Sequence, residues 1–392
     1  MHRASLYILL FSVALLSAFG IVMLASTGYY LEEGEKQTYA TMNNQATWLG
    51  LAVVVAVVVA FLNPEKLYEY RWWIFGVALV GLVMCYVPFF AKEINGARRW
   101  VSLHSLGLDR PSFQPSEVAK LAIIIVLAGW FARYEPLTRE FIGGFVKPGC
   151  LLAVTVLLIA GEVDLGTAAL VTAVGVSLMY VAGTRWYYLA AVVVAAGGAL
   201  GLAIRLTPNR VARIMAFLDL EKYKDEIGLQ QWRALMALGS GSYEGVGAGD
   251  GRMKRGFLPE SETDFIFPNV GEEHGLYGTL LIMGLFISVS IAGMIIAHRA
   301  PTRFMRLVAV GITVTLALEA LINMGVTTAL LPNKGLPLPF VSYGGTNLLF
   351  AMISVGILVA IHRKSFGTVA RKDLLETRRG GMRAATHGAH SL

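Results

Sequence analysis

Acidic side chains are concentrated in residues 256–278, GFLPESETDFIFPNVGEEHGLYG. Glu260, Glu262 and Asp264 fall within five residues, directly before an aromatic segment. Carboxylates this close repel one another, and beside a region of low dielectric some of their pKa values should rise. A raised pKa suits a general base that takes a proton near neutral pH, and the same oxygens could bind a divalent cation. A solvated acidic loop without chemistry is the alternative, and the segment alone leaves both open.

The composition shows what kind of structure has to position these carboxylates. Hydrophobic residues make up 56% of the 392 residues, charged residues make up 15%, and the mean hydropathy is +0.61. These values exclude an ordinary soluble protein. Cys85 and Cys150 both lie in apolar runs, so neither disulfides nor cysteine-ligated metals are expected. The net charge of +7 is assigned to the basic cytoplasmic loops of a membrane protein, and no nucleic-acid partner is expected.

Ten apolar windows are long enough to cross a bilayer, which takes about 20 residues. They cover residues 6–27, 46–62, 72–90, 116–132, 148–162, 165–182, 186–205, 269–297, 307–325 and 344–362. We therefore predict an all-α polytopic membrane protein with one ten-helix domain, residues 1–362, and a disordered basic tail, residues 363–392. Lys and Arg predominate on the side of the two termini, which predicts that both termini are cytoplasmic. The large loop 206–268, between the seventh and eighth helices, then lies outside.

The outer loop 91–115 carries Arg98 and Arg99 next to Trp100. Basic residues on the outer face oppose the usual charge bias of membrane proteins, so we expect them to bind a specific anion such as a phosphate. The alternative is that they snorkel toward lipid headgroups beside an interfacial tryptophan.

Several predicted spans carry ionisable groups. Glu117 and Lys120 stand three residues apart and so share a helical face at the outer end of the fourth span. Such charges are costly in a bilayer unless they pair or line a wet cavity, and a structural ion pair is an equally good interpretation. Glu319 and Asn323 share a face of the ninth span and predict a buried polar contact. Glu162 and Asp164 lie in a short outer turn, where Asp164 is expected to cap the next helix.

The large outer loop combines helical, glycine-rich and charged segments. Residues 209–220 and 229–238 have helix-like periodicity and are predicted to lie on the outer membrane surface. The glycine-rich segment 239–251 has no GK[ST] sequence of a phosphate-binding loop, so its glycines indicate flexibility or a close approach of backbone to a ligand. Basic residues follow at 252–255, directly before the acidic group. Cations followed by carboxylates could hold a diphosphate while a base acts nearby.

The last outer loop, residues 323–350, cannot continue as a helix because three prolines and a pair of glycines interrupt it. Irregular backbone at membrane depth is tolerated where it lines a cavity or is buried in protein. Lys334, Ser342 and Tyr343 are the polar groups that this loop could present to a cavity. A re-entrant structural plug is the alternative.

At these segments the chain resembles the SEDS family, the FtsW, RodA and SpoVE group of bacterial peptidoglycan polymerases. The matching pieces, in the order of the family, are NGARRW (95–100), FQPSEVAKLA (113–122), VDLGTA (163–168), LPESETDFIFPNVGEEHG (258–275), and NMGV with LLPNKGLPLPFVSYGGTNLL (323–349). The sequence of the last matching segment, residues 323–349, favours the FtsW branch. Three positions depart from the family pattern: Glu262 stands where His is frequent, Pro268 where a small residue is usual, and Val163 where Pro is common.

The resemblance implies a ten-helix protein of the bacterial cytoplasmic (inner) membrane, with its active site on the outer side. It implies a glycosyltransferase that polymerises lipid II into glycan strands and releases undecaprenyl diphosphate. Asp264 would be the general base toward the 4-hydroxyl of the acceptor sugar. A divalent cation, Mg²⁺ or Mn²⁺, bound by Asp264 and Glu262 could assist it, and no organic cofactor is expected. The implied partners are a class B penicillin-binding protein, which supplies transpeptidation, and other divisome or elongasome proteins.

The resemblance also suggests roles for residues around the base. The candidates to hold the diphosphates are Arg98, Arg99, Lys120 and Lys334. The residues expected to orient or support these groups, or to shape the cavity, are Glu117, Gln114, Glu260, Glu262, Ser342 and Tyr343.

Two other functions compete with polymerisation. A lipid II flippase could use Glu117, Lys120 and Glu319 as a charged path through the membrane, although no inverted repeat is visible in the sequence. A scaffold could recruit another wall enzyme without chemistry of its own. The Asp264→Asn substitution separates these functions, because it should abolish polymerisation only in an enzyme.

Overall fold

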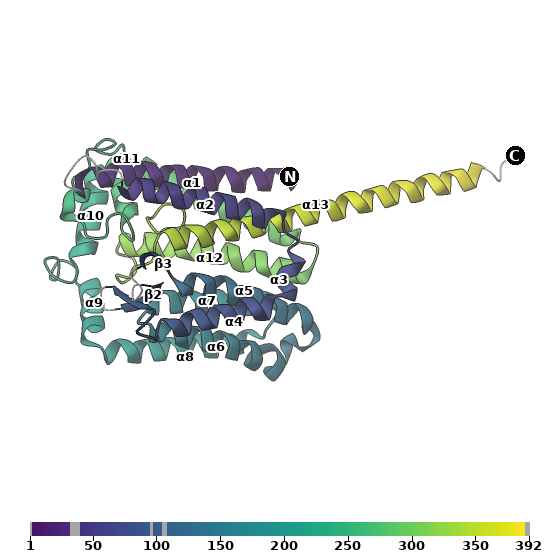
Figure 1. Ribbon diagram of the computed structural model, residues 1–392, viewed down its shortest axis with the longest axis horizontal. Helices are drawn as coiled ribbons and strands as arrows, with labels where there is room; N and C mark the ends of the chain where they lie inside the picture. Colours follow the sequence, from purple (N-terminus) through teal and green to yellow (C-terminus); the bar gives the residue numbers. More distant parts are fainter. Residues whose placement is uncertain (1, 32–39, 95–96, 104–107, 389–392) are drawn as a thin grey trace.

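The computed structural model describes residues 2–31, 40–94, 97–103 and 108–388. Most of its helices run side by side along the long axis of the molecule (Figure 1). Within the described ranges they are α1 (His2–Leu31), α2 (Ala40–Phe61), α3 (Glu65–Glu69), α4 (Arg71–Met84), α5 (Pro115–Arg133), α6 (Lys147–Gly161), α7 (Leu165–Ala182), α8 (Trp186–Arg205), α9 (Pro208–Leu218), α10 (Leu229–Gly241), α11 (Ile266–His298), α12 (Arg303–Thr327) and α13 (Gly345–Gly388). Short 3-10 and π turns, η2 (Glu135–Arg139), η3 (Phe141–Val146) and η4 (Met253–Phe257), complete the helical elements. The helices α9 and α10 lie across one end of the molecule (Figure 1).

The predicted all-α polytopic membrane fold is confirmed. In the described part of the chain, eight helices are long and apolar enough to cross a membrane, and two shorter apolar helices lie at Arg71–Met84 and Trp186–Ala199. All ten coincide with predicted windows. The window 72–90 was predicted too long, because the helix ends at Met84, before Pro88. Whether all ten cross the membrane stays a prediction.

The core lies around α5 and α12. In the apolar windows of these two helices 78% and 72% of the residues are buried, whereas in α2 only 11% are. The two central helices therefore present side chains to protein on nearly every face, and polar groups on them have to find partners inside the bundle.

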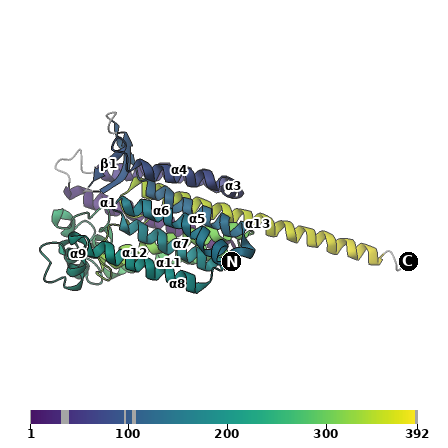
Figure 2. The same ribbon diagram turned by 90° about the horizontal axis from the view of Figure 1, so that it is seen from below.

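The two ends of the bundle differ. The N-terminus of α1 and the projecting part of α13 lie at one end, and α9, α10 and the strands lie at the other (Figures 1 and 2). We call the second one the outer end. Both termini thus leave from the same end, as an even number of spans requires. The predicted N-in, C-in orientation of this arrangement in a membrane stays a prediction.

A small antiparallel sheet lies within the segment 91–115, which was predicted as an outer loop without assigned secondary structure. Its strands are β1 (Ala91–Ile94), β2 (Ala97–Leu103) and β3 (Leu108–Phe113), in the order β1-β2-β3. Lys92 is the backbone partner of Trp100 in the first pair. Successive side chains of a strand point to opposite faces, so neighbouring residues of β2 are sent in different directions.

The glycine-rich segment 239–251 wraps around the outer end of α11. The amides of Val246 and Gly247 donate to the carbonyls of Glu272 and Glu273, at 2.9 and 3.2 Å. A Cβ added at Gly245 would lie 2.1 Å from the Glu273 carbonyl oxygen, so only glycine permits this approach. The close approach expected from these glycines is therefore made to α11.

A buried ion pair secures the same region. The ammonium of Lys254, in η4, lies 2.7 Å from the carboxylate of Glu273, and it donates to the hydroxyl of Ser26 at 2.5 Å. Lys254 is fully buried. The pair joins α1, η4 and α11 directly before the acidic segment. Because both charges have left water, each depends on the other.

The basic tail, residues 363–392, was expected to be a disordered unit, and this stays a prediction. α13 is helical to Gly388 and projects beyond the bundle (Figure 1). The eighth predicted span begins at Ile266, so Pro268 lies in the first helical turn, where proline is tolerated.

Candidate active site

The main chain that carries Asp264 is held by groups from two other segments. The carbonyl of Asp264 accepts from the side-chain amide of Asn323, on α12, at 2.8 Å. The carbonyl of Thr263 accepts from the Ser342 hydroxyl at 2.5 Å, and the carbonyl of Glu262 accepts from the Tyr343 amide at 2.9 Å. Three consecutive carbonyls are thus fixed, which gives the neighbouring carboxyl group a defined position.

The segment 328–344, which we call the proline loop, lies directly against Asp264. Asn323 bridges the two segments, because its amide also donates to the carbonyl of Leu336 at 2.7 Å. A Cβ added at Gly335 would lie 2.3 Å from Oδ2 of Asp264. The carboxylate therefore occupies space that any side chain at residue 335 would fill.

The sheet brings Arg99 to the same region. Its Nη2 donates to the carbonyl of Val163 at 2.9 Å, and its Nη1 lies 3.9 Å from Oδ1 of Asp164, the residue that caps α7. Asp164 is buried and binds the amide and hydroxyl of Thr167. The expected cap at Asp164 is confirmed.

Lys334 of the proline loop packs over the first turn of α7. A Cβ added at Gly166 would lie 3.5 Å from Cδ of Lys334 and 3.6 Å from Oδ1 of Asp164. Arg99 and Lys334 thus both lie beside the N-terminus of α7. Helix N-termini and cations together favour anions.

The pKa of Asp264 is raised from its ordinary value of 3.8 to about 6. Burial of the carboxyl group is the largest cause, and the negative charge of Glu260 adds to it, whereas Arg99 opposes the rise. Glu260 itself is exposed and accepts from the Thr263 hydroxyl at 2.9 Å. The carboxylate that acts most strongly on Asp264 is thus Glu260.

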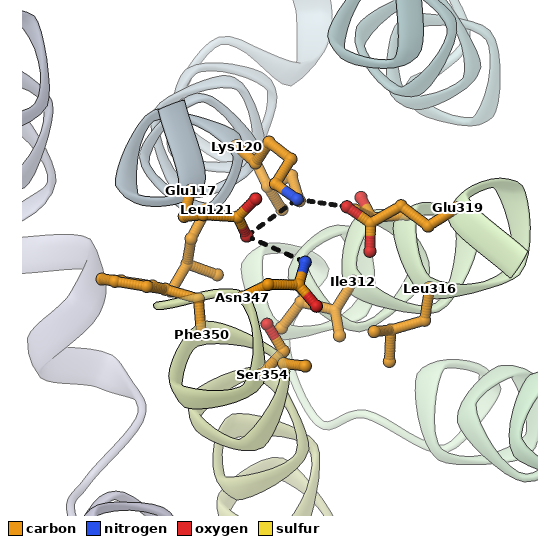
Figure 3. Close-up of a pocket in the computed structure, with 12 residues that line it drawn as sticks. Glu117, Lys120, Leu121, Ile312, Leu316, Glu319, Asn347, Phe350 and Ser354 are labelled. Atoms are coloured by element: carbon orange, nitrogen blue, oxygen red, sulfur yellow. Dashed lines mark hydrogen bonds and ion pairs between the residues drawn. The ribbon is translucent and has the colours of Figure 1, made fainter. Parts of the chain in front are cut away.

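Glu117 and Lys120 lie in a different place, inside the bundle. Lys120 is 2.9 Å from the carboxylate of Glu117, and it also pairs with Glu319 of α12 (Figure 3). The amide of Asn347, on α13, donates to Glu117 at 3.4 Å. This buried cluster lines a cavity of about 20 Å³, room for a single water molecule.

The cluster is connected to Asp264 through α12. Glu319 and Asn323 are one helical turn apart on the same buried face of this helix, as predicted. Lys120 therefore supports the helix that holds the Asp264 carbonyl. The contacts of the described residues place Lys120 among carboxylates, and this favours the structural interpretation of Glu117 and Lys120.

Two other candidates, Arg98 and Gln114, have their partners outside the site. Arg98 pairs with Glu93 on the hairpin, at 3.2 Å. Arg98 and Arg99 are neighbours on β2, so their side chains point to opposite faces of the sheet. The side chain of Gln114 donates to the Ser116 hydroxyl at 3.0 Å, at the start of α5.

Three residues that hold the site together were not among the predicted site residues. Asn323 was interpreted as a buried contact only, and Gly335 was not singled out. Gln45, on α2, donates to the carbonyl of Ser342 at 3.1 Å and accepts from the amide of Gly344 at 3.2 Å. A polar residue near the start of an apolar run was the signal that could have identified Gln45.

The donor set at Asp264 does not form a metal cage by itself. Among the described residues there is no group of three or more His, Cys, Asp or Glu side chains that could hold a metal ion. Mg²⁺ is often bound through one or two carboxylates together with substrate phosphates, and this is the mode of binding that the carboxylates here could support.

The chain was compared with known proteins. Residues 6–366 match the family model FTSW_RODA_SPOVE, described as "Cell cycle protein". A protein of Coxiella burnetii named "Probable peptidoglycan glycosyltransferase FtsW" is 34% identical over 88% of this chain and 93% of its own length. A protein of Geobacter metallireducens with the same name is 33% identical over 94% of this chain and 96% of its own length.

Two solved structures have the same fold. A chain from a study of polymerization and crosslinking by a peptidoglycan synthase complex superimposes with a TM-score of 0.76, at 27% identity, over 91% of this chain and 97% of its own. The rod shape determining protein RodA of Thermus thermophilus gives a TM-score of 0.67, at 26% identity, over 91% of this chain and 96% of its own. With the family model matching nearly the whole membrane bundle, the chain belongs to the FtsW, RodA and SpoVE family.

Proposed function

We propose that this protein is a peptidoglycan glycosyltransferase that polymerises lipid II into glycan strands at the outer face of the bacterial cytoplasmic membrane. The names of its relatives support the activity and favour the division branch, FtsW, over elongation. The observation that carries the site assignment is Asp264: a carboxyl group with a pKa of about 6, on a fixed main chain, beside Arg99 and Lys334.

In the proposed reaction Asp264 acts as the general base. A sugar hydroxyl is a poor nucleophile, so removal of its proton as it attacks accelerates the reaction by about 10²–10⁴-fold. The acceptor oxygen forms the new bond to the anomeric carbon of the donor sugar, and the bond from that carbon to the diphosphate breaks. The proton moves to Asp264, and undecaprenyl diphosphate leaves.

The proposed role of Arg99 and Lys334 is to stabilise the leaving diphosphate. Negative charge develops on the diphosphate as the C–O bond breaks, and cations already in position stabilise that charge without reorganisation. The N-terminus of α7, with its partial positive charge, lies beside both residues. Lys120 is not assigned to the diphosphate, since Glu117 and Glu319 already bind it.

A divalent cation is a further element of this proposal. It would bind to Asp264 and Glu262 together with the substrate phosphates and would stabilise their charge. Because the chain supplies few ligands there, weak binding that depends on substrate is expected.

The competing function, a flippase, has one observation in its favour: charged residues within the membrane bundle. The cavity that they line, about 20 Å³, is much smaller than a disaccharide headgroup, and its three charges are paired. The proposed base Asp264 and the cations Arg99 and Lys334 lie at the outer end, and this favours the polymerase.

The proposal is tested with purified full-length protein and lipid II, with the glycan products separated on a gel. The assay is run alone, with a class B penicillin-binding protein, and with EDTA. Glycan strands that appear with the partner support the enzyme and its proposed partner. An inactive protein in every condition, with normal membrane insertion, contradicts the proposed function.

A further inference from the structure

The turn between α6 and α7 carries a buried carboxyl group for which the proposed mechanism has no use. Glu162 is 97% removed from solvent (relative exposure 3%), and neither of its carboxyl oxygens has a hydrogen-bond partner among the described residues. Buried acids without a partner are rare, because the charged form pays the full cost of leaving water. Glu162 therefore needs either a proton or a cation.

The cation within reach is Arg99. Its Nη2 is bonded to the carbonyl of Val163, the residue that follows Glu162, and its Nε is buried without a hydrogen-bond partner in the described part of the chain. The guanidinium thus has a donor without a partner in the described part of the chain, and its positive charge lowers the pKa of Glu162. The backbone between Glu162 and Asp164 is strained, with a φ of 67° at the β-branched Val163, and such strain is concentrated at functional sites.

The other described groups that act on the pKa of Glu162 are the Cys85 thiol and Asp164. The Cys85 thiol, at the end of α4, is a weak donor that lowers this pKa more than Arg99 does. The neighbouring Tyr86 hydroxyl donates to the carbonyl of Leu158 at 2.5 Å. Asp164, at the start of α7, adds negative charge. Lys334 lies farther along, over Gly166.

Arg99 also acts on two other carboxylates. It lies 3.9 Å from Asp164 and lowers the pKa of Asp264 through its charge. A single guanidinium thus serves Glu162, Asp164 and Asp264. Its position has to depend on which of these groups is ionised.

We propose that Glu162 is a positioning residue of the transfer site that acts through Arg99. Neutral Glu162 leaves the guanidinium beside Asp164 and Asp264, where it meets the diphosphate, and ionised Glu162 draws the guanidinium toward α6. This inference rests on the proposed function and deepens it, because it assigns the alkaline limit of activity to Glu162.

The direction of the pH dependence follows from burial. Loss of water is the largest cause that raises the pKa of Glu162, to about 8, so the group is neutral near pH 7 and ionised above about pH 9. The pKa of Asp264 is lower, so the base is ionised throughout this range. Activity is expected to fall with rising pH through the loss of Arg99 from the substrate, chiefly as an increase in KM.

The test compares pH profiles of the full-length protein with its partner enzyme. In the wild type, kcat/KM for lipid II should fall about 30-fold between about pH 7 and pH 9.5, as expected for one essential proton with a pKa of about 8. In Glu162→Gln, kcat/KM at pH 7 and kcat/KM at pH 9.5 should differ by less than about twofold. Glu226→Gln, which removes an exposed carboxylate of the outer loop, should keep the wild-type fall.

Infrared difference spectroscopy provides a readout that needs no activity. A carboxyl band that titrates near pH 8 should be present in the wild type and absent in Glu162→Gln. In Arg99→Gln the same band should titrate at a higher pH, because Arg99 lowers the pKa of Glu162.

The inference is overturned if Glu162→Gln keeps the alkaline fall, or if the carboxyl titration does not move in Arg99→Gln. Should the wild type polymerise nothing at any pH, the proposed function fails. The infrared series still decides whether Glu162 and Arg99 are coupled, so the two failures are distinguishable.

Discussion

The side chain of Asn323 holds the main chain of the base: its amide donates to the Asp264 carbonyl at 2.8 Å and to the Leu336 carbonyl at 2.7 Å. Asn323→Ala leaves two buried carbonyls without this donor, at a cost of about 1–3 kcal/mol each. Displacement of Asp264 by about 1 Å would lower the rate of transfer by about 100-fold. We expect kcat to fall by that order and KM to change little.

Gln231→Ala is the matched control for Asn323→Ala. Gln231 is equally buried and its amide also donates to two carbonyls, those of Val326 and Leu331, at 2.9 and 2.8 Å, but neither belongs to Asp264. Gln231→Ala should lower the melting temperature by about as much as Asn323→Ala does, but it should reduce kcat much less. Equal losses of kcat in both variants would show that Asn323 is only structural.

A methyl group at residue 335 should disable the site. In Gly335→Ala the new Cβ would meet the Asp264 carboxylate at 2.3 Å, so the carboxylate must move. We expect kcat/KM to fall at least about tenfold, with nearly normal stability, because a displaced base transfers protons poorly. In Gly344→Ala, in the same region, the nearest atom is 3.7 Å away, and activity should be kept. Wild-type activity of Gly335→Ala would argue against the position assigned to Asp264.

The ionisation of Asp264 predicts the acid limit of activity. Because a general base works only when it is ionised, kcat/KM should fall about tenfold per pH unit below about pH 6. A profile that stays flat down to about pH 4.5 would exclude Asp264 as the base whose ionisation limits the rate.

The same raised pKa affects stability. A carboxyl group whose pKa is higher in the folded state stabilises the fold fully below its unfolded value, 3.8, and this contribution is lost as the pH rises through about 6. At pH 7.5 the neutral variant Asp264→Asn should therefore melt at a higher temperature than the wild type, and the difference should shrink toward pH 4. A lower melting temperature at pH 7.5 would contradict the burial of the charge.

The buried pair of Lys254 and Glu273 predicts a large effect on stability. Lys254→Met leaves the Glu273 carboxylate uncompensated, which should cost about 3–5 kcal/mol. The double variant Lys254→Met, Glu273→Met should recover most of the loss. Glu93→Gln, in the exposed pair with Arg98, should cost less than about 1 kcal/mol. Thermal melts of the purified proteins in detergent compare all three.

Sequence patterns correctly predicted features that depend on residues close together in the chain. Hydropathy located the helices, and turn chemistry gave the cap at Asp164. The density of acids pointed to the segment 256–278, and the family resemblance singled out Asp264 within it. The helical spacing of Glu319 and Asn323 correctly placed them on one buried face.

Contacts between distant segments were not visible in the sequence. Arg98 and Arg99 were treated alike because the segment was interpreted as an outer loop, and only a strand sends them to opposite faces. Lys120 was assigned to a diphosphate because its partner Glu319 is 199 residues away. The glycine-rich segment was expected either to be flexible or to approach a ligand, and the structure shows a close approach to α11.

The proposed mechanism depends most on Asp264 as the base, and one measurement tests this role directly. Asp264→Asn keeps the size of the side chain and removes its ability to take a proton. The purified variant, inserted normally and bound to its partner enzyme, is incubated with lipid II at about pH 7.5 beside the wild type. We predict that the wild type forms glycan strands and that the variant forms fewer by at least about 100-fold. Polymerisation by the variant at the wild-type rate would contradict the assignment.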